Sequence, residues 1–232
     1  MTDPHELLAQ LQADRLAWHE PAPPPRWAGH PLRYKRRSRA VTYRVRLDLL
    51  DAKPPIWRRL DVASDLYLDD LHVVVQAAMG WSDSHLHAFS AGGRVFMPGS
   101  FQFLNEFDVA EGERGTPEAQ VRLDEVLREL GDRLWYTYDF GDGWDHVLKL
   151  ESVQTRRAGD AAFRCVGGRR ACPPEDCGGI PGYEDLLAYR EDPASVPDWV
   201  AERAAEFWAA GNFDPAEFSV AETNDALDAI RA

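Results

Sequence analysis

Val41-Thr-Tyr-Arg-Val-Arg-Leu-Asp-Leu49 and Ile56-Trp-Arg-Arg-Leu-Asp-Val62 are the two stretches that decide the fold. Apolar and polar residues alternate along both, which is the period-two pattern of a strand with one buried face. A Pro-rich turn separates them and predicts a hairpin. Asp69 and Asp70 then favour a helix N-terminus, apolar residues follow at helical spacing, and Gly80 stands where a helix ends. The chain therefore starts as a ββα unit.

The rest of the chain predicts further strands and then helices. Alternation returns after the first helix, and the last third has helical spacing with Pro at the helix starts. This order predicts an α+β fold with a mixed or antiparallel sheet, a helix after the first hairpin and C-terminal helices. The expected segments are a strand or hairpin with a Gly92-Gly93 turn over His85–Met97, a short helix over Leu123–Leu130, strands over Leu134–Phe140 and Trp144–Val153, and helices over Pro181–Arg190 and Pro197–Ala210.

The N-terminal part differs in composition from the rest. Residues 3–19 have the spacing of an amphipathic helix, and Pro21-Ala-Pro-Pro-Pro25 predicts a stiff linker. A basic arm follows. We therefore divide the chain into residues 1–39, with helix, linker and arm, and residues 40–232, an α+β domain with a C-terminal helical extension.

Length, composition and charge limit the class of protein. The chain has 232 residues, 44% hydrophobic residues and a net charge of −13. It is long enough to form a full core, and no apolar run is long enough to cross a membrane. The start of the chain does not have the pattern of a signal peptide, and three cysteines do not fit a disulfide scaffold. These features predict a soluble cytoplasmic protein.

The charge is unevenly distributed. Residues 26–46 contain eight cations and no acid, whereas the chain as a whole is strongly acidic. Such a block predicts contact with a nucleic-acid or protein partner. The alternative is that the arm pairs with acidic groups of the same chain. The eight cations are Arg26, Arg33, Lys35, Arg36, Arg37, Arg39, Arg44 and Arg46.

The three cysteines lie within thirteen positions, in a segment rich in Gly and Pro. Cys172 and Cys177 have the spacing of a local ligand pair, and Cys165 supplies a third thiol. Zinc prefers four Cys or His ligands, so these thiols could hold a structural zinc with His146 as the fourth ligand, for which His85 or His87 are substitutes. The alternative is three reduced cysteines packed against aromatic residues.

Two Asp/His constellations could support catalysis. Asp139, Asp142 and Asp145 precede His146 closely, and carboxylates in this number can hold a divalent cation. His85 and His87 fall on one face of a strand if the segment is extended, and His72 on the preceding helix could join them. The structural alternative is that Asp142 forms a Gly-Asp-Gly turn and that the histidines are hydrogen-bonded.

Several unusual strings occur together in this chain. It contains Pro55-Ile-Trp-Arg58, Met79-Gly-Trp81, His85-Leu-His87, Tyr138-Asp-Phe-Gly-Asp-Gly-Trp-Asp-His146 and Ala171-Cys-Pro-Pro-Glu-Asp-Cys-Gly-Gly179. In these strings, and in Leu71-His72 and Gly182-Tyr183, the chain resembles the plasmid pRiA4b ORF-3-like family over about residues 41–190. That family is also described as TnpR-type passenger proteins of insertion elements. The resemblance implies an α+β domain and an association with plasmids or mobile elements. It implies no established biochemical activity.

The sequence thus leads to a binding or interaction protein, carried by mobile or plasmid DNA, with a structural zinc. A phosphate-binding Gly-rich loop and a Gly-x-Ser-x-Gly elbow are both absent, so an enzyme is less favoured. The alternative is a metal-dependent hydrolase or nuclease that uses the Asp/His residues in one cleft. Trp57, Trp81, Trp135 and Trp144 are expected in the core.

Overall fold

The fold is built on one eight-stranded sheet with the strand order β5-β4-β3-β6-β7-β1-β2-β8. The computed structural model describes residues 34–211 and 213–230. All neighbouring strands are antiparallel except β4 and β5, which are parallel. The strands are β1 (Val41–Leu49), β2 (Ile56–Ala63), β3 (His87–Ala91), β4 (Phe101–Leu104), β5 (Thr116–Pro117), β6 (Arg133–Tyr138), β7 (Trp144–Thr155) and β8 (Phe163–Arg169).

The helices lie between and after the strands, which confirms the predicted α+β class, the early helix and the C-terminal helices. Gly80 closes the first helix with a φ of 89° in the left-handed region, as the sequence predicts. The helices are α2 (Leu68–Met79), α3 (Glu106–Ala110), α4 (Leu123–Val126), α5 (Gly179–Glu191), α6 (Asp198–Ala210) and α7 (Val220–Ala229), with 3-10 turns η1 (Glu118–Gln120) and η2 (Pro193–Ser195). None of these helices is both long and apolar enough to span a bilayer.

Three segments differ from the prediction. Of the strand or hairpin expected over residues 85–97, the strand forms as β3, but no hairpin does, because a loop of nine residues separates β3 from β4. The helix expected to reach Leu130 ends at Val126. Cys165 lies inside β8, so it belongs to a strand and not to a cysteine loop. The predicted N-terminal helix and Pro-rich linker lie outside the described residues.

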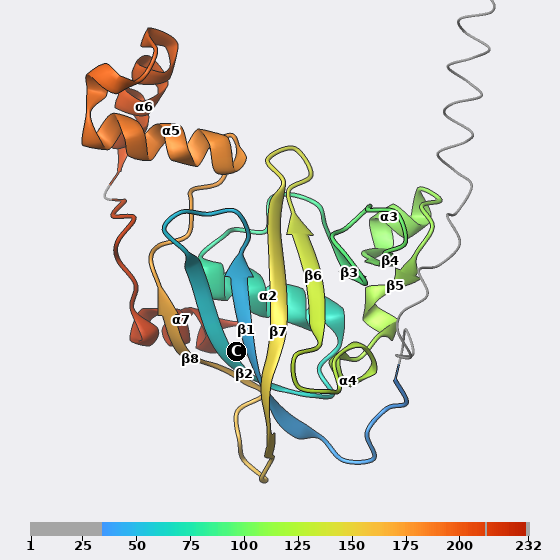
Figure 1. Cartoon of the computed structure of the whole chain (residues 1–232). Helices are drawn as coiled ribbons and strands as arrows, with labels where there is room; N and C mark the ends of the chain where they lie inside the picture. The colour runs from blue at the N-terminus through green and yellow to red at the C-terminus, as the bar shows by residue number, and fades with distance from the viewer. Residues whose placement is uncertain (1–33, 212, 231–232) are drawn as a thin grey trace, which may run out of the picture.

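The core lies on one face of the sheet, under α2 (Figure 1). Inward residues of β1, β6 and β7 are fully buried there, as the alternating pattern requires. Trp81 and Trp144 belong to this core. Trp57 and Trp135 are only half-buried, because strand alternation directs them to the opposite face; the prediction that all four are core is wrong for these two.

The described part of the basic arm is tied to the domain. The Arg36 Nε atom lies 3.2 Å from a Glu125 carboxylate oxygen. Arg37 donates its backbone N–H to the buried carboxylate of Asp124 and its Nε to the hydroxyl of Tyr43. Arg44 and Arg46 belong to β1 itself. For these four cations the structure supports the alternative that the arm pairs with its own chain.

Helix α7 protects the sheet edge formed by β8. The Asn224 side chain accepts the backbone N–H of Cys165 and donates to its carbonyl, each at 2.9 Å. A single amide thus replaces the neighbouring strand that an edge position lacks. The ring of Phe218 covers Gly168, where a Cβ atom would come within 2.3 Å of it. The C-terminal segment therefore completes the sheet.

We predict that Asn224→Ala lowers the free energy of unfolding by about 1–3 kcal/mol, because it leaves two backbone groups of Cys165 without protein partners. Urea unfolding monitored by tryptophan fluorescence measures the change. Asp225→Ala, at the next and exposed position of the same helix, is the matched control and should stay within about 0.5 kcal/mol of wild type. Equal losses in both variants would contradict the role of the Asn224 amide.

Candidate functional site

A histidine and two carboxylates meet where three separate segments approach each other. His85 lies in the loop before β3, Asp139 starts the β6–β7 turn, and Asp176 lies between β8 and α5. The His85 Nε2 atom is 3.0 Å from Asp176 Oδ1 and 3.7 Å from Asp139 Oδ2. We call these three residues the His85 site. Their ligand atoms all lie within 4.8 Å of one another.

The backbone holds Asp139 in place. Its Oδ1 atom accepts the N–H groups of Gly141 and Asp142 at 2.9 and 3.3 Å, so Oδ2 remains to face His85. Asp139 and Asp176 both have left-handed backbones, with φ of 55° and 57°. Non-glycine residues rarely adopt this conformation, and it concentrates at functional sites. Both carboxylates are thus positioned by strained turns.

The two turns are locked together by glycines. A Cβ atom on Gly179 would lie 2.2 Å from the carbonyl oxygen of Asp142, and one on Gly182 would lie 1.9 Å from that of Cys177. The Asp142 carboxylate also accepts the N–H of Gly178 at 3.0 Å. This contact fixes the turn that carries Asp139 against the segment that carries Asp176.

A second hydrogen-bonded group borders the His85 site. Glu175 accepts the hydroxyls of Tyr138 and Ser82, and the hydroxyl of Tyr138 accepts the backbone N–H of Ser84. Burial and the Glu175 carboxylate raise the pKa of Tyr138. Burial opposes ionisation of Glu175, but the hydrogen bonds from Ser82 and Tyr138 outweigh it and lower the pKa of Glu175. At neutral pH this group is therefore a phenol bound to a carboxylate.

His72 belongs to a closed ring of hydrogen bonds. The backbone N–H of Asp83 donates to Gln76, the Gln76 amide donates to Tyr136, and the Tyr136 hydroxyl lies 2.9 Å from His72 Nδ1. His72 Nε2 lies 2.8 Å from the Asp83 carboxylate. The carboxylate can only accept, so His72 carries its proton on Nε2. Burial and the neighbouring His87 lower the pKa of His72 to about 4, against the effect of Asp83.

His72 also stacks on His87. The ring centroids are 3.4 Å apart and the planes differ by 4°. His87 Nε2 lies 2.9 Å from the buried Glu118 carboxylate. His72, Asp83 and His87 form a second group of ligand atoms within 4.8 Å. A metal binds an imidazole nitrogen in the ring plane, and one ion cannot lie in two parallel planes. This arrangement therefore suits shared protons better than a shared metal.

Sequence comparison places the chain among known proteins. The model of the plasmid pRiA4b ORF-3-like proteins matches residues 41–222. The chain belongs to this family. The protein y4hQ of Sinorhizobium fredii (strain NBRC 101917 / NGR234), described as uncharacterised, is 32% identical over 200 residues, which is 83% of this chain and 94% of y4hQ. The structure of MM3350 from Methanosarcina mazei Go1, titled as a protein of unknown function, is 31% identical, with a TM-score of 0.65 and coverage of 79% of this chain and 96% of that one.

The strings that resemble the pRiA4b ORF-3-like family come together in space at the His85 site. The Tyr138–His146 string supplies Asp139 and the turn, and the Ala171–Gly179 string supplies Asp176 and the glycine that receives the turn. Trp81 joins them, because its indole N–H donates to the carbonyl of Pro173. The unusual residues of these strings are thus explained by one local structure.

Of the predicted catalytic residues, only His85 and Asp139 meet. His85 and His87 do not share a strand face, since His85 precedes β3; His87 instead stacks on His72, which the sequence had raised as a partner. Asp142 binds the backbone of Gly178. Asp145 accepts from Thr137 and Arg94. The single cleft expected for the hydrolase alternative is not formed by these residues.

The predicted zinc ligands are all buried, but they do not converge. The cysteines are free, and no cysteine belongs to either ligand group found among the described residues. Burial raises the pKa of each thiol, to about 12 for Cys177, although zinc requires thiolates. Zinc binding by the cysteines stays a prediction. Asp176 was missed, and its place between Cys172 and Cys177 was the signal that could have marked it.

His146 lies in the core beneath Trp81. The two rings meet edge to face with centroids 5.3 Å apart, and His146 is fully buried. Neither ring nitrogen makes a hydrogen bond of ordinary geometry, although backbone groups of Trp144 and Tyr136 favour its charged form electrostatically. Burial dominates and lowers the pKa of His146 to about 3, and the charge of Arg58 acts in the same direction. His146 is thus a neutral core residue.

We predict that Gly179→Ala destabilises the protein by at least about 2 kcal/mol more than Gly143→Ala. Both glycines have a φ of 68°, so an alanine meets the same backbone strain of about 1 kcal/mol at each position. Only Gly179 has no space for a Cβ atom, whereas Gly143 has nothing within 4 Å. Chemical denaturation measures both. Similar losses would contradict the close contact with Asp142.

We predict that stability falls as the pH falls from about 6.5 towards 3, in part through His146. In that range the unfolded chain takes up a proton on this residue and the folded chain does not, so unfolding gains about 1.4 kcal/mol per pH unit per proton. In His146→Leu this contribution disappears. Unfolding midpoints measured from pH 7 to 4 should decline less steeply in the variant, and parallel curves would contradict the assignment.

Proposed function

We propose that this protein binds a divalent transition metal ion, with zinc as the leading candidate, at the His85 site. The observation that carries the proposal is the state of His85 Nε2. This atom is buried and makes no hydrogen bond, yet two carboxylate oxygens lie within 4 Å of it. A buried polar atom without a hydrogen bond is costly, and a metal ion would remove that cost while neutralising two acids.

The donor set suits this ion. One imidazole and two carboxylates are ligand types that zinc accepts at about 2.0–2.2 Å, whereas magnesium prefers oxygen ligands alone. The side chain of Asp176 is 76% exposed and that of His85 is 29% exposed, so the site opens to solvent. Such a site retains free coordination positions, which can take water or a ligand.

Protein contacts hold the Asp139 carboxylate and the backbone near Asp176 without an ion. Asp139 is oriented by two backbone N–H groups, and Asp176 is joined to it through the contact between Gly179 and Asp142. Preorganised ligands of this kind favour a specific ion site over a chance cluster of surface acids. The function we propose is therefore binding; the expected carriage by insertion elements stays a prediction from the family resemblance.

The test is a zinc titration of EDTA-treated, full-length protein prepared without a histidine tag. We expect one zinc per chain, and we expect Asp176→Asn to weaken binding at least about tenfold, because it removes a charged ligand. Asp176 is exposed and has few other contacts, so the variant should fold. Circular dichroism checks that it does.

Two control variants identify the site. Asp83→Asn makes the same substitution at another exposed aspartate with the same φ of 57°, but in the hydrogen-bonded ring of His72. Cys172→Ser tests the site predicted from the sequence. Both should bind zinc as wild type does. If Asp83→Asn or Cys172→Ser loses zinc while Asp176→Asn keeps it, the His85 site is not the metal site.

A further inference from the structure

Among residues 34–211 and 213–230, no helix covers one face of the sheet. Helices α2 and α7 pack on the same side of β1, β2 and β8, and Figure 1 shows no described helix in front of these strands or of β6 and β7. The outward residues of β1 and β2 are only half-buried, whereas every second residue between them is fully buried. The outward face of β6, β7, β1, β2 and β8 is therefore available to a partner.

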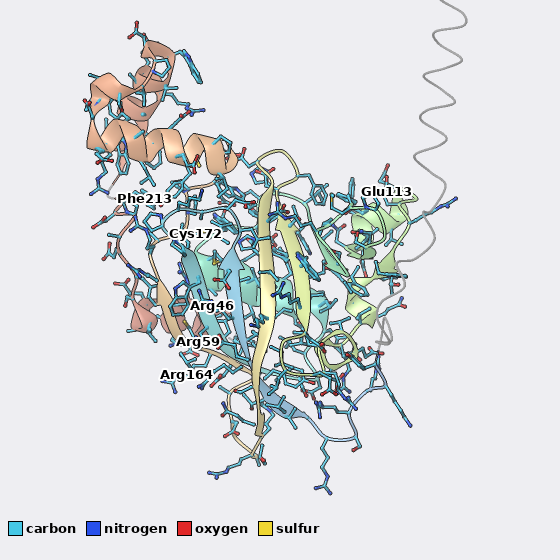
Figure 2. All side chains as sticks on the ribbon, viewed as in Figure 1. Arg46, Arg59, Glu113, Arg164, Cys172 and Phe213 are labelled. Carbon is cyan, nitrogen blue, oxygen red and sulfur yellow. The ribbon has the colours of Figure 1, made fainter. Side chains whose placement is uncertain are left out.

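This face is basic in an acidic protein. Strand register directs seven cations and four carboxylates to it, a surplus of three positive charges, whereas the whole chain has a net charge of −13. Figure 2 shows three of the cations, Arg46, Arg59 and Arg164, one after another along the strands that face the viewer. The cations are Arg44, Arg46, Arg59, Arg133, Lys149, Arg164 and Arg169; the carboxylates are Asp48, Asp61, Asp145 and Glu151.

The cations differ in how they are held. Three form ion pairs on the sheet: Arg44 with Asp61 and Arg46 with Asp48, both at 2.7 Å, and Arg59 with Glu151 at 2.6 Å. Within the described chain the other four are exposed and have no ion-pair partner; these are Arg133, Lys149, Arg164 and Arg169. The face thus has three cations held in ion pairs and four exposed cations without one among the described residues.

Aromatic rings lie among these charges. The guanidinium carbons of Arg46 and Arg59 are 4.5 and 5.1 Å from the ring centre of Trp57. Trp135 and Val147 form a cross-strand pair on the same face. Gly167 lies beside Trp57, where a Cβ atom would be in ordinary contact with the ring at 3.9 Å.

We propose that this sheet face binds single-stranded nucleic acid. Cations without an ion pair contact the phosphates and release counterions, while guanidinium planes and the half-buried rings of Trp57 and Trp135 stack on unpaired bases. A duplex hides its base faces, and its major groove is read by a protruding helix or two-stranded ribbon, which this flat surface lacks. The acidic remainder of the chain repels a polyanion and confines it to this face.

Fluorescence anisotropy with a labelled oligothymidylate of about 20 nucleotides tests the proposal, with a duplex of the same length as competitor. We expect the single strand to bind more tightly than the duplex. Log affinity should fall with log salt with a slope of roughly −2 to −3, as three or four phosphate contacts require. EDTA should not change the result, since the His85 site lies elsewhere. Absence of binding at about 50 mM NaCl, or equal or tighter binding of the duplex, would overturn the proposal.

Charge-reversal variants locate the surface. Lys149→Glu with Arg164→Glu changes two exposed, unpaired cations of the face, and we expect at least about tenfold weaker binding and a shallower salt slope. Arg190→Glu with Arg203→Glu on α5 and α6 makes the same change in net charge away from the sheet and should retain most of the affinity. Equal losses in the two double variants would mean that net charge alone governs binding, and the sheet-face assignment would fail.

Discussion

The contact between the β6–β7 turn and the glycines before α5 is the constraint on which the His85 site depends. The Asp142 carbonyl fills the space that a side chain of Gly179 would need, and the Asp142 carboxylate holds the N–H of Gly178. Two segments far apart in sequence thus approach to backbone contact. Because each also carries an aspartate with a left-handed backbone, their approach brings Asp139 and Asp176 to His85. Gly141 therefore holds the Asp139 carboxylate directly, and Gly178 and Gly179 act on its position through their contact with Asp142.

Next to the His85 site, most buried polar groups have hydrogen-bond partners without a change in their ionisation. In the ring through Asp83, Gln76, Tyr136 and His72 each member donates once and accepts once, which determines the direction of every proton. The ring holds Asp83 through both its carboxylate and its backbone N–H. His146 is different, because its two ring nitrogens lack such partners and its neutrality comes from burial. Histidine thus has three roles in this domain: His85 is the proposed metal ligand, His72 is a member of the hydrogen-bonded ring, and His146 is a neutral core residue.

The local pattern of the sequence predicts the fold better than the site. Alternation located β1, β2, β6 and β7, and helical spacing with Gly80 located α2, because these signals depend on neighbouring residues alone. The site depends on loops and on register. His85 and His87 look like a pair only if both are in a strand, and β3 begins at His87. Asp139, Asp142 and Asp145 are close in sequence, but the tight turn points them to three different partners. Asp176 could not be joined to His85 without knowing that Asp142 meets Gly178 and Gly179.

The distribution of charge connects the sheet with the rest of the molecule. Adjacent residues of a strand face opposite sides of the sheet. In the Pro55–Arg58 string, Trp57 is therefore half-buried on the outward face, whereas Arg58 is buried. Arg58 points into the protein, where its guanidinium donates to backbone carbonyls such as that of Ala78 at the end of α2. Trp57 points outward, among Arg46 and Arg59. Of the four basic residues of β1 and β2, Arg44, Arg46 and Arg59 thus reach the outward face and only Arg58 is buried. The net charge of the whole chain argues against a nucleic-acid-binding protein. That value, however, is the sum of an acidic body and a basic sheet face. A polyanion would meet these two surfaces separately.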